Sequence, residues 1–333
     1  MLAQTPPSLP AIPVLTVGRD FPSATLTAEL PRAHALLDLA TNGVPPRALR
    51  MLDFISRKWL LRNANTHLAE IDAIARTLDR PGAYFLSVNY EWGCTCKVGP
   101  SPDHASARLI RVLDWRTPGL GRNIIAANVD CDAGSFVTLT WPGYTGVLQG
   151  MAPGRFSAAL NQAPMRRAGG GFLPLDWAMN KRHVWRMPHG TPAHLLRQAF
   201  ERAATYQDAR RLLIETPIAS PAIFSLAGIK PGDTCVIERT ELAAHVHDGA
   251  GVAANNWQAA GWHGRPRGND SAGRACQMAA VELSFEDTLP WLQAPVLNSF
   301  TRLVVIADAK EGRLIAQGYE SDGAATAVLH YAA

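Results

Sequence analysis

The pattern of apolar and polar positions changes character about a quarter of the way along the chain. Before that point, apolar residues recur every three or four positions in two stretches, 47–61 and 66–78, which is the spacing of one helix face. Thr66 stands where it can cap the second of these helices. Residues 1–30 are rich in proline and show no period. We therefore expect a helical leader with an irregular start.

After residue 93 the pattern shortens to apolar segments separated by turns that contain Gly and Pro, which is typical of strands. The strands predicted in this way are 94–98, 107–115, 123–129, 135–141, 155–160, 222–226, 234–238, 242–247, 251–254 and a final hairpin of 302–306 with 314–318. Two helices interrupt them, one opening at Thr191-Pro192 and one over 206–214 that Thr205 caps. This order predicts two sheets packed face to face with helices outside.

Composition and charge exclude several classes of protein. Of the 333 residues 47% are hydrophobic, and Lys plus Arg exceed Asp plus Glu by four without a dense basic run. We therefore do not expect nucleic acid as a partner. No stretch is both long and apolar enough to predict an integral membrane segment. Met1–Pro13 lacks the basic and then apolar order of a signal peptide, which predicts a cytoplasmic location.

The boundary between the two patterns carries the candidate chemistry. If the chain is cut between Gly93 and Cys94, Cys94 gains a free α-amine beside its thiol. Reference pKa values of about 8.5 for the thiol and about 7.7–8.0 for the amine bring both groups near neutral pH. One residue would then supply both nucleophile and base. Gly93 has no Cβ to hinder the thiol. The alternative is that Cys94 and Cys96 are ordinary cysteines on a strand.

Several motifs together match a known family. They are Gly93-Cys94-Thr95, Arg111-Val112-Leu113-Asp114, the segments 143–150 and 153–157, Leu160-Asn161, and the segments 205–213, 220–224 and 235–239. From about Tyr84 to the C-terminal region, the chain resembles the acid ceramidase and N-acylethanolamine acid amidase family. These are N-terminal-nucleophile hydrolases, and bile salt hydrolases and penicillin V acylases are their more distant relatives.

The resemblance implies an α+β fold of four αββα layers, made as a precursor. The precursor would be cut into a helical leader, 1–93, and a catalytic segment, 94–333, which stay associated. The activity implied is hydrolysis of the carbon–nitrogen bond of N-acyl amides, through a thioester on Cys94. The substrate would be a small, lipid-like molecule, and the apolar leader helices could line its pocket as well as form core. No metal or organic cofactor is called for.

The resemblance also assigns roles near the new terminus. Cys94 is similar to the family's nucleophile, and Arg111 and Asp114 match the pair that holds the terminus. Elementary electrostatics agrees, because a carboxylate orients an amine and a guanidinium favours a thiolate. An isolated Arg and Asp would otherwise be read as a surface ion pair.

Three further positions resemble family residues. Asn255 is similar to the asparagine that helps to form the oxyanion hole, although Asn256 beside it leaves the register open. Asn161 resembles a second active-site asparagine at a strand end. Arg274 is the candidate for an active-site arginine, with Arg267 as its competitor.

The chain departs from the family pattern at two positions. Gln162 stands where ceramidase-like members have Glu, so the carboxylate that could tune the terminal amine is missing. Cys96 stands where Ser is usual. Because one residue separates Cys94 from Cys96 on a strand, both thiols should lie on one face, where oxidation to a strained disulfide could inhibit the enzyme.

Other functions remain open at this point. An acyltransferase would use the same thioester but pass the acyl group to an amine. A thiolate metal site could be built from Cys94, Cys96, Cys131 and either His245 or His247, although their spacing is not that of a zinc knuckle. A binding protein could have kept the fold without the activity.

Overall fold

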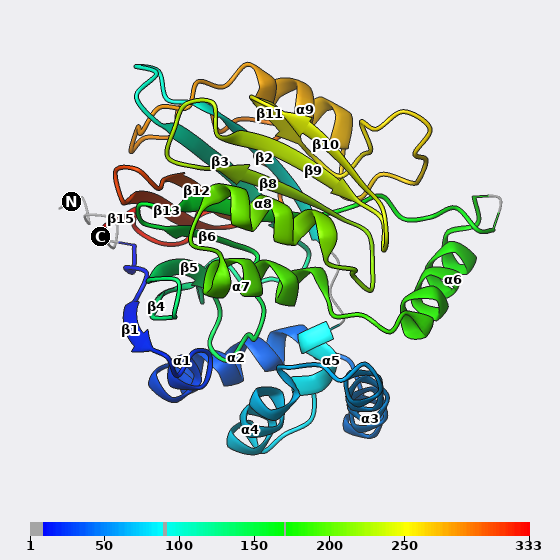
Figure 1. The fold of residues 1–333 in the computed structure, drawn as a ribbon. Helices are drawn as coiled ribbons and strands as arrows, with labels where there is room; N and C mark the ends of the chain where they lie inside the picture. The colour runs from blue at the N-terminus through cyan, green and yellow to red at the C-terminus, as the bar shows by residue number, and fades with distance from the viewer. Residues whose placement is uncertain (1–8, 89–91, 170) are drawn as a thin grey trace, which may run out of the picture.

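The computed structural model describes residues 9–88, 92–169 and 171–333 (Figure 1). Two stacked β-sheets form its centre. Sheet A has the strand order β1-β4-β5-β6-β7-β8-β9-β10, with antiparallel neighbours except for the parallel pair β1 and β4. Its strands are β1 (Val14–Gly18), β4 (Ile125–Val129), β5 (Phe136–Thr140), β6 (Gln149–Ala152), β7 (Phe156–Gln162), β8 (Ala222–Ala227), β9 (Thr234–Arg239) and β10 (Ala244–Asp248).

Sheet B holds the candidate nucleophile. Its order is β11-β2-β3-β12-β13-β14, and β15 also pairs with β13. Its strands are β2 (Trp92–Pro100), β3 (Ala107–Trp115), β11 (Gly251–Ala253), β12 (Thr301–Asp308), β13 (Arg313–Glu320), β14 (Gly323–Ala324) and β15 (Leu329–Ala332). The register between β2 and β3 sets Gly93 opposite Asp114 and Cys96 opposite Arg111. Two distant motifs thus meet at one end of the sheet.

Helices cover the outer faces of both sheets (Figure 1). They are α7 (Pro192–Arg202) and α8 (Tyr206–Glu215) on sheet A, and α9 (Ser271–Ala279) on sheet B. Phe200 of α7 stacks between Phe136 and Phe156, with ring centroids 5.1 and 5.0 Å apart. Met278 of α9 packs in the cluster that includes Val112. The four-layer αββα arrangement expected from the sequence is therefore confirmed.

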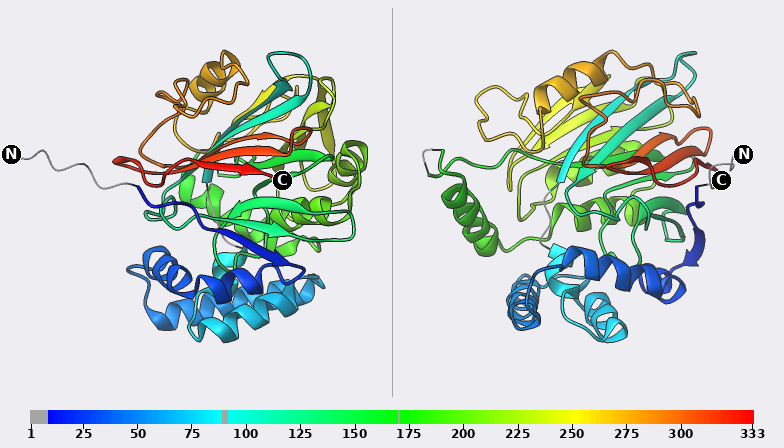
Figure 2. Two further views of the ribbon diagram at one scale, coloured as in Figure 1. Left: turned by 90° about the vertical axis from the view of Figure 1, so that its left-hand side faces the viewer. Right: turned by 180° about the vertical axis from the view of Figure 1, so that it is seen from behind.

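The leader forms a helical layer beside the sheets (Figure 2). Its helices are α1 (Ser23–Ala28), α2 (Leu30–Ala40), α3 (Pro46–Arg62), α4 (Leu68–Leu78) and α5 (Ala83–Val88). Leu60 and Ile71 are fully buried, and each contributes roughly 1.5–3 kcal/mol by leaving water. The leader also supplies β1 to sheet A, in a region where the sequence predicted no element. Leader residues 1–8 and 89–91 lie outside the described residues.

The predicted helix caps are confirmed in the catalytic segment. The Thr191 hydroxyl accepts from the His194 N–H at 3.2 Å, and the Thr205 hydroxyl accepts from the Asp208 N–H at 3.1 Å. The predicted Thr66 cap is wrong: α4 begins one residue later than Thr66 would allow, after His67, whose side chain makes no capping bond.

A further helix, α6 (Leu173–Arg186), lies away from the sheets and near α3 (Figure 1). The Trp59 indole of α3 donates to the Val184 carbonyl of α6 at 3.2 Å. Both helices keep large apolar side chains exposed, including Phe54 and Trp177. Even so, no helix within the described ranges is long and apolar enough to cross a membrane.

Candidate active site

The Cys94 thiol is buried inside the protein. Gly93 and Cys94 belong to the continuous strand β2, so the structure shows the uncut form. Arg111 Nη2 donates to Cys94 Sγ at 2.9 Å and to the Leu160 carbonyl at 2.8 Å. Burial raises the pKa of the Cys94 thiol to about 11, although Arg111 acts against this rise. The thiol is therefore protonated at neutral pH and needs a base.

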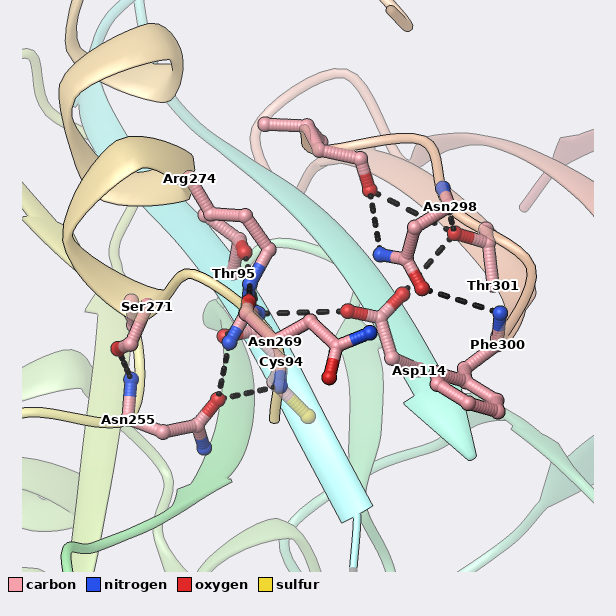
Figure 3. Close-up of polar contacts among 12 residues, drawn as sticks. Cys94, Thr95, Asp114, Asn255, Asn269, Ser271, Arg274, Asn298, Phe300 and Thr301 are labelled. Atoms are coloured by element: carbon pink, nitrogen blue, oxygen red, sulfur yellow. Dashed lines mark hydrogen bonds and ion pairs between the residues drawn. The ribbon is translucent and has the colours of Figure 1, made fainter. Parts of the chain in front are cut away.

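The backbone of Cys94 is held as firmly as its thiol (Figure 3). Its N–H donates to Asn255 Oδ1 at 2.7 Å, and its carbonyl accepts from Arg274 Nη1 at 2.8 Å. Asn255 Oδ1 also accepts from Arg274 Nη2 at 3.0 Å. Because two donors point at this oxygen, the side-chain amide of Asn255 has only one workable orientation.

This orientation bears on the role expected for Asn255. Its Nδ2 donates to the Gln162 carbonyl at 2.7 Å, so its oxygen and not its N–H faces Cys94. In the uncut chain Asn255 therefore holds the nitrogen that would become the α-amine. To donate to an oxyanion, Nδ2 would have to leave the Gln162 carbonyl.

Arg274 connects the strands around Cys94. It is fully buried, and its Nη1 donates to Thr95 Oγ1 at 2.9 Å, while its Nε donates to the Asn269 carbonyl at 2.7 Å. The first turn of α9 places it there, since Asp270 caps the helix by accepting from the Gly273 N–H at 3.0 Å. A single guanidinium thus ties α9 to β2.

Asp114 lies on β3, opposite Gly93. Its Oδ2 lies 3.3 Å from Arg274 Nη1, and its Oδ1 accepts from Thr301 Oγ1 at 3.0 Å. Burial raises the pKa of Asp114, and Arg274 opposes this rise. Arg111 and Asp114 thus act at different points in the uncut chain, Arg111 on the thiol and Asp114 through Arg274.

Glycine is the only residue type that fits at position 93 without a shift of its neighbours. A Cβ there would lie 3.3 Å from the Gly268 Cα and 3.5 Å from the Asp114 Cβ. The first of these contacts is to backbone, which cannot rotate away. This crowding is a second reason for glycine, beside the open approach for the thiol that the sequence suggested.

The second thiol lies on the same face of β2 as the first. Cys94 Sγ is 4.0 Å from the Leu160 carbonyl of β7, and Cys96 meets Ser225 of β8, so both face sheet A. The shared face predicted from the sequence is therefore confirmed. Both thiols are free, and burial raises the pKa of Cys96 to about 12.

The two choices that the sequence left open are separated by the structure. Ser271 Oγ accepts from the Asn255 N–H and donates to Asn256 Oδ1, both at 2.8 Å, so Asn256 points away from Cys94. Arg267 Nε donates to the Ala163 carbonyl at 3.0 Å, whereas Arg274 binds Cys94 itself. Of the two asparagines it is therefore Asn255 that bonds Cys94, and of the two arginines it is Arg274.

Asn161 lies on β7 with its side chain between the sheets. Its Nδ2 donates to the carbonyls of Ala253 and Ala254, at 3.1 and 3.3 Å. Asn161 therefore braces the segment that leads into Asn255. Among its hydrogen bonds within the described residues there is none to Cys94, and the active-site role that the resemblance implies for Asn161 stays a prediction.

A cavity of about 230 Å³ opens beside the site. Its walls are mainly apolar and come from both parts of the chain. Ile55 and Trp59 of α3 lie on one side, Trp177 of α6 on another, and Trp92 and Asn161 on the side of Cys94. The leader thus contributes directly to the cavity.

The thiolate metal site is not present in the described parts of the chain, where no three His, Cys, Asp or Glu side chains gather around a common point. His247 Nε2 instead lies 3.2 Å from Glu238 Oε2, on the neighbouring strand β9. Its ring packs against that of His245, with centroids 4.6 Å apart.

Some positioning residues were not found from the sequence. Thr95 lies inside a recognised motif, and Ser271 lies in the segment that suggested Arg274, so both could have been proposed. Thr301 could not, because it is 187 residues from Asp114 and contacts it only through the pairing of β12 with β3.

Comparisons with known proteins identify relatives of part of this chain. The chain is 36% identical over 105 residues to the acid ceramidase of Homo sapiens, covering 31% of this chain and 25% of that protein. It is 32% identical over 119 residues to the acid ceramidase of Heterocephalus glaber, covering 34% and 28%. The chain thus matches only about a quarter of the length of these relatives. No protein-family profile matches the sequence.

A solved structure shares the architecture. The Caenorhabditis elegans N-acylethanolamine-hydrolyzing acid amidase ortholog superposes with a TM-score of 0.50 at 23% identity, covering 72% of this chain and 100% of that one. The resemblance to acid ceramidases and N-acylethanolamine acid amidases is therefore confirmed. The fold is that of an N-terminal-nucleophile hydrolase.

Proposed function

We propose that this chain, which resembles the acid ceramidases, is an autoprocessed cysteine amidohydrolase that cleaves N-acyl amides through a thioester on Cys94. One observation carries the proposal. Asn255 Oδ1 holds the Cys94 nitrogen at 2.7 Å while Arg111 holds its sulfur at 2.9 Å. The nucleophile and the future base are thus both fixed in place before the cut.

Maturation begins at the bond before Cys94. The sulfur attacks the Gly93 carbonyl carbon, forming a C–S bond as the C–N bond breaks, and the thiol proton passes to the Cys94 nitrogen. Water then cleaves this thioester, leaving a carboxylate on Gly93 and a free α-amine on Cys94. Arg274 supports the step by binding the Cys94 carbonyl at 2.8 Å, which keeps the strand from turning.

Turnover repeats this chemistry on a substrate. The α-amine takes the thiol proton while the sulfur attacks the acyl carbonyl, and the same proton passes to the departing amine. Water then hydrolyses the thioester, with the α-amine as base. Arg111 steadies the thiolate, and Asp114 acts through Arg274 to keep the terminus in register.

The intact mass of the purified protein tests the proposal. We expect fragments of 93 and 240 residues from the wild type, and an uncut chain of 333 residues from Cys94→Ala. Cys131→Ala changes a half-buried cysteine in the loop after β4, so this variant should be cut like the wild type. A wild-type protein that stays whole and yet hydrolyses amides at full rate would rule out processing as a requirement.

A further inference from the structure

One oxygen in the candidate site has no partner. Asn161 is 1% exposed, and within the described residues its Oδ1 makes no hydrogen bond. Its Nδ2 donates to the Ala253 and Ala254 carbonyls, so turning the amide over would set an oxygen against two other acceptors. The two bonds from Nδ2 therefore fix the orientation of the Asn161 amide, and this orientation leaves Oδ1 without a donor.

Asn161 lies next in the chain to the residue whose carbonyl contacts the reacting sulfur. Asn161 follows Leu160, whose carbonyl is 4.0 Å from Cys94 Sγ, and it lines the cavity beside the site. Its Nδ2 also braces the two residues before Asn255, which holds the Cys94 nitrogen. A buried acceptor without a donor is unfavourable, so such an atom calls for an explanation.

The chemistry of an amide substrate offers one donor for it. When the acyl carbon lies at Cys94 Sγ, the amide N–H is one bond away from that carbon. At the sulfur, Arg111 presents a donor, which suits the carbonyl oxygen and not the N–H. Asn161 lines the cavity, and its Oδ1 is a buried acceptor that has no partner for the N–H to displace.

We propose that Asn161 Oδ1 accepts the N–H of the scissile amide, which makes the enzyme selective for secondary amides over N-alkylated amides. This inference rests on the proposed function. Asn161 is then a specificity residue that touches the substrate, in addition to bracing the Asn255 segment.

The first test uses the self-cleaved wild type and three substrates with one acyl chain: N-lauroylethanolamine, its N-methyl analogue, and the ester in which oxygen replaces the N–H. Reactive Cys94 is counted by alkylation, so that kcat/KM refers to active sites. We expect the N-methyl amide to react roughly 10- to 100-fold more slowly than the secondary amide, the loss for an unpaired buried acceptor. Equal rates for the two amides would overturn the proposal.

The second test separates the lost hydrogen bond from steric effects. Asn161→Ala also removes the Nδ2 brace on Ala253 and Ala254, so it should slow both substrates, but the loss in kcat/KM for the secondary amide should exceed the loss for the ester roughly 10- to 100-fold, since the ester has no N–H to bind. Asn128→Ala, the same change on β4, should alter neither substrate. Equal loss on amide and ester would show that Asn161 only braces the fold.

The two tests are independent. If Asn161→Ala does not mature, the comparison of wild-type rates on the two amides still decides the matter. If the wild type cleaves none of the three substrates, the proposed function fails, which is distinct from a wild type that cleaves them all without preferring the N–H.

Discussion

Cys94 and Cys96 have the same chemistry and face the same sheet, but their surroundings give them different roles. Arg111 Nη2 donates to Cys94 Sγ at 2.9 Å, whereas Arg111 acts on Cys96 through its charge alone, and burial raises the pKa of Cys96 to about 12. Cys94 has the cation that stabilises a thiolate, and Cys96 is an inert thiol nearby.

Substitution by serine should separate the two thiols. We expect Cys96→Ser to keep turnover and to lose any sensitivity to mild oxidants, because no partner remains for a disulfide with Cys94. Cys94→Ser should lose nearly all turnover, as a hydroxyl is a far weaker nucleophile. Amide hydrolysis before and after oxidant treatment measures both. If activity survived in Cys94→Ser and vanished in Cys96→Ser, the nucleophile would be Cys96 and the assignment to Cys94 would be wrong.

Residues inside motifs could be predicted from the sequence, while many of their partners could not. Cys94, Asn255 and Arg274 were found because their side chains stand in recognisable segments. The contacts of Arg111 with the carbonyls of Leu148 and Leu160 were not found. Every residue has a carbonyl, so no sequence signal marks the ones that a buried guanidinium will meet.

The turn that precedes α4 contacts a buried histidine of α7. His194 Nδ1 lies 3.2 Å from Asn65 Nδ2, its Nε2 lies 3.0 Å from Thr145 Oγ1, and its ring centroid is 4.5 Å from that of His67. Burial lowers the pKa of His194 well below 6.5, with His67 and Arg197 adding to the effect. His194 is therefore neutral in the folded protein.

Acidification should weaken this contact. As pH falls below 6.5, the unfolded chain takes up a proton at His194 that the folded protein refuses, so the free energy of unfolding decreases. Glu70, which faces His67 and Arg197, has a lowered pKa and loses its contribution at still lower pH. We expect Tm to fall between about pH 7 and pH 5, and to fall less steeply in His194→Gln.

The control for this prediction is His263→Gln, which changes an exposed histidine and should leave the pH dependence of Tm as it is in the wild type. An unchanged slope in His194→Gln would mean that other groups control the acid response.

Element boundaries were predictable where the local chemistry was strong. The strand 107–115 was predicted with the bounds that β3 has, because its apolar residues recur up to Trp115 and polar residues flank it at Ser106 and Arg116. The Thr191 and Thr205 caps followed from their position before a helical pattern. β1 was missed, since five residues among prolines carry no period, and their pairing with β4 is set by distant sequence.

Across the whole molecule, the leader is joined to the catalytic segment by charge as well as by core packing. Glu70 of α4 lies 2.6 and 2.9 Å from the Arg197 guanidinium of α7, which also donates to the Thr145 carbonyl at 3.0 Å. The leader strand β1 adds backbone pairing with β4. We therefore propose that the two fragments stay together after cleavage.

Gel filtration of the cleaved protein measures this association. The wild-type fragments should elute as one species, and Arg197→Ala should weaken the association by less than the roughly 3–5 kcal/mol of a fully buried broken pair, because Glu70 keeps its contact with His67. Arg211→Ala, which removes an exposed pair with Asp208, should change little. Separate elution of the wild-type fragments would contradict the proposed association.

The cavity between α3 and α6 suggests that an acyl chain is the recognised part of the substrate. We expect kcat/KM to rise with chain length across N-acyl substrates of one amine, by up to about 0.8 kcal/mol per buried methylene, before levelling off. Ile55→Ser, in the α3 wall, should reduce this slope. Faster hydrolysis of acetyl than of long-chain amides would contradict a lipid-like substrate. The cytoplasmic location expected from the sequence stays a prediction.

The proposed cut falls inside a paired strand. Trp92 lies opposite Trp115 on β3, and Cys94 lies opposite Leu113, so both sides of the broken bond keep their partner strand. Pairing with β3 therefore holds the two ends in place after the bond between them is broken. Once the sulfur has displaced the Cys94 nitrogen, this pairing keeps the Gly93 thioester beside the new amine, so the amine can attack the thioester and restore the amide until water cleaves it. The direction of the reaction is then decided by water's access to the thioester, and not by the ends drifting apart.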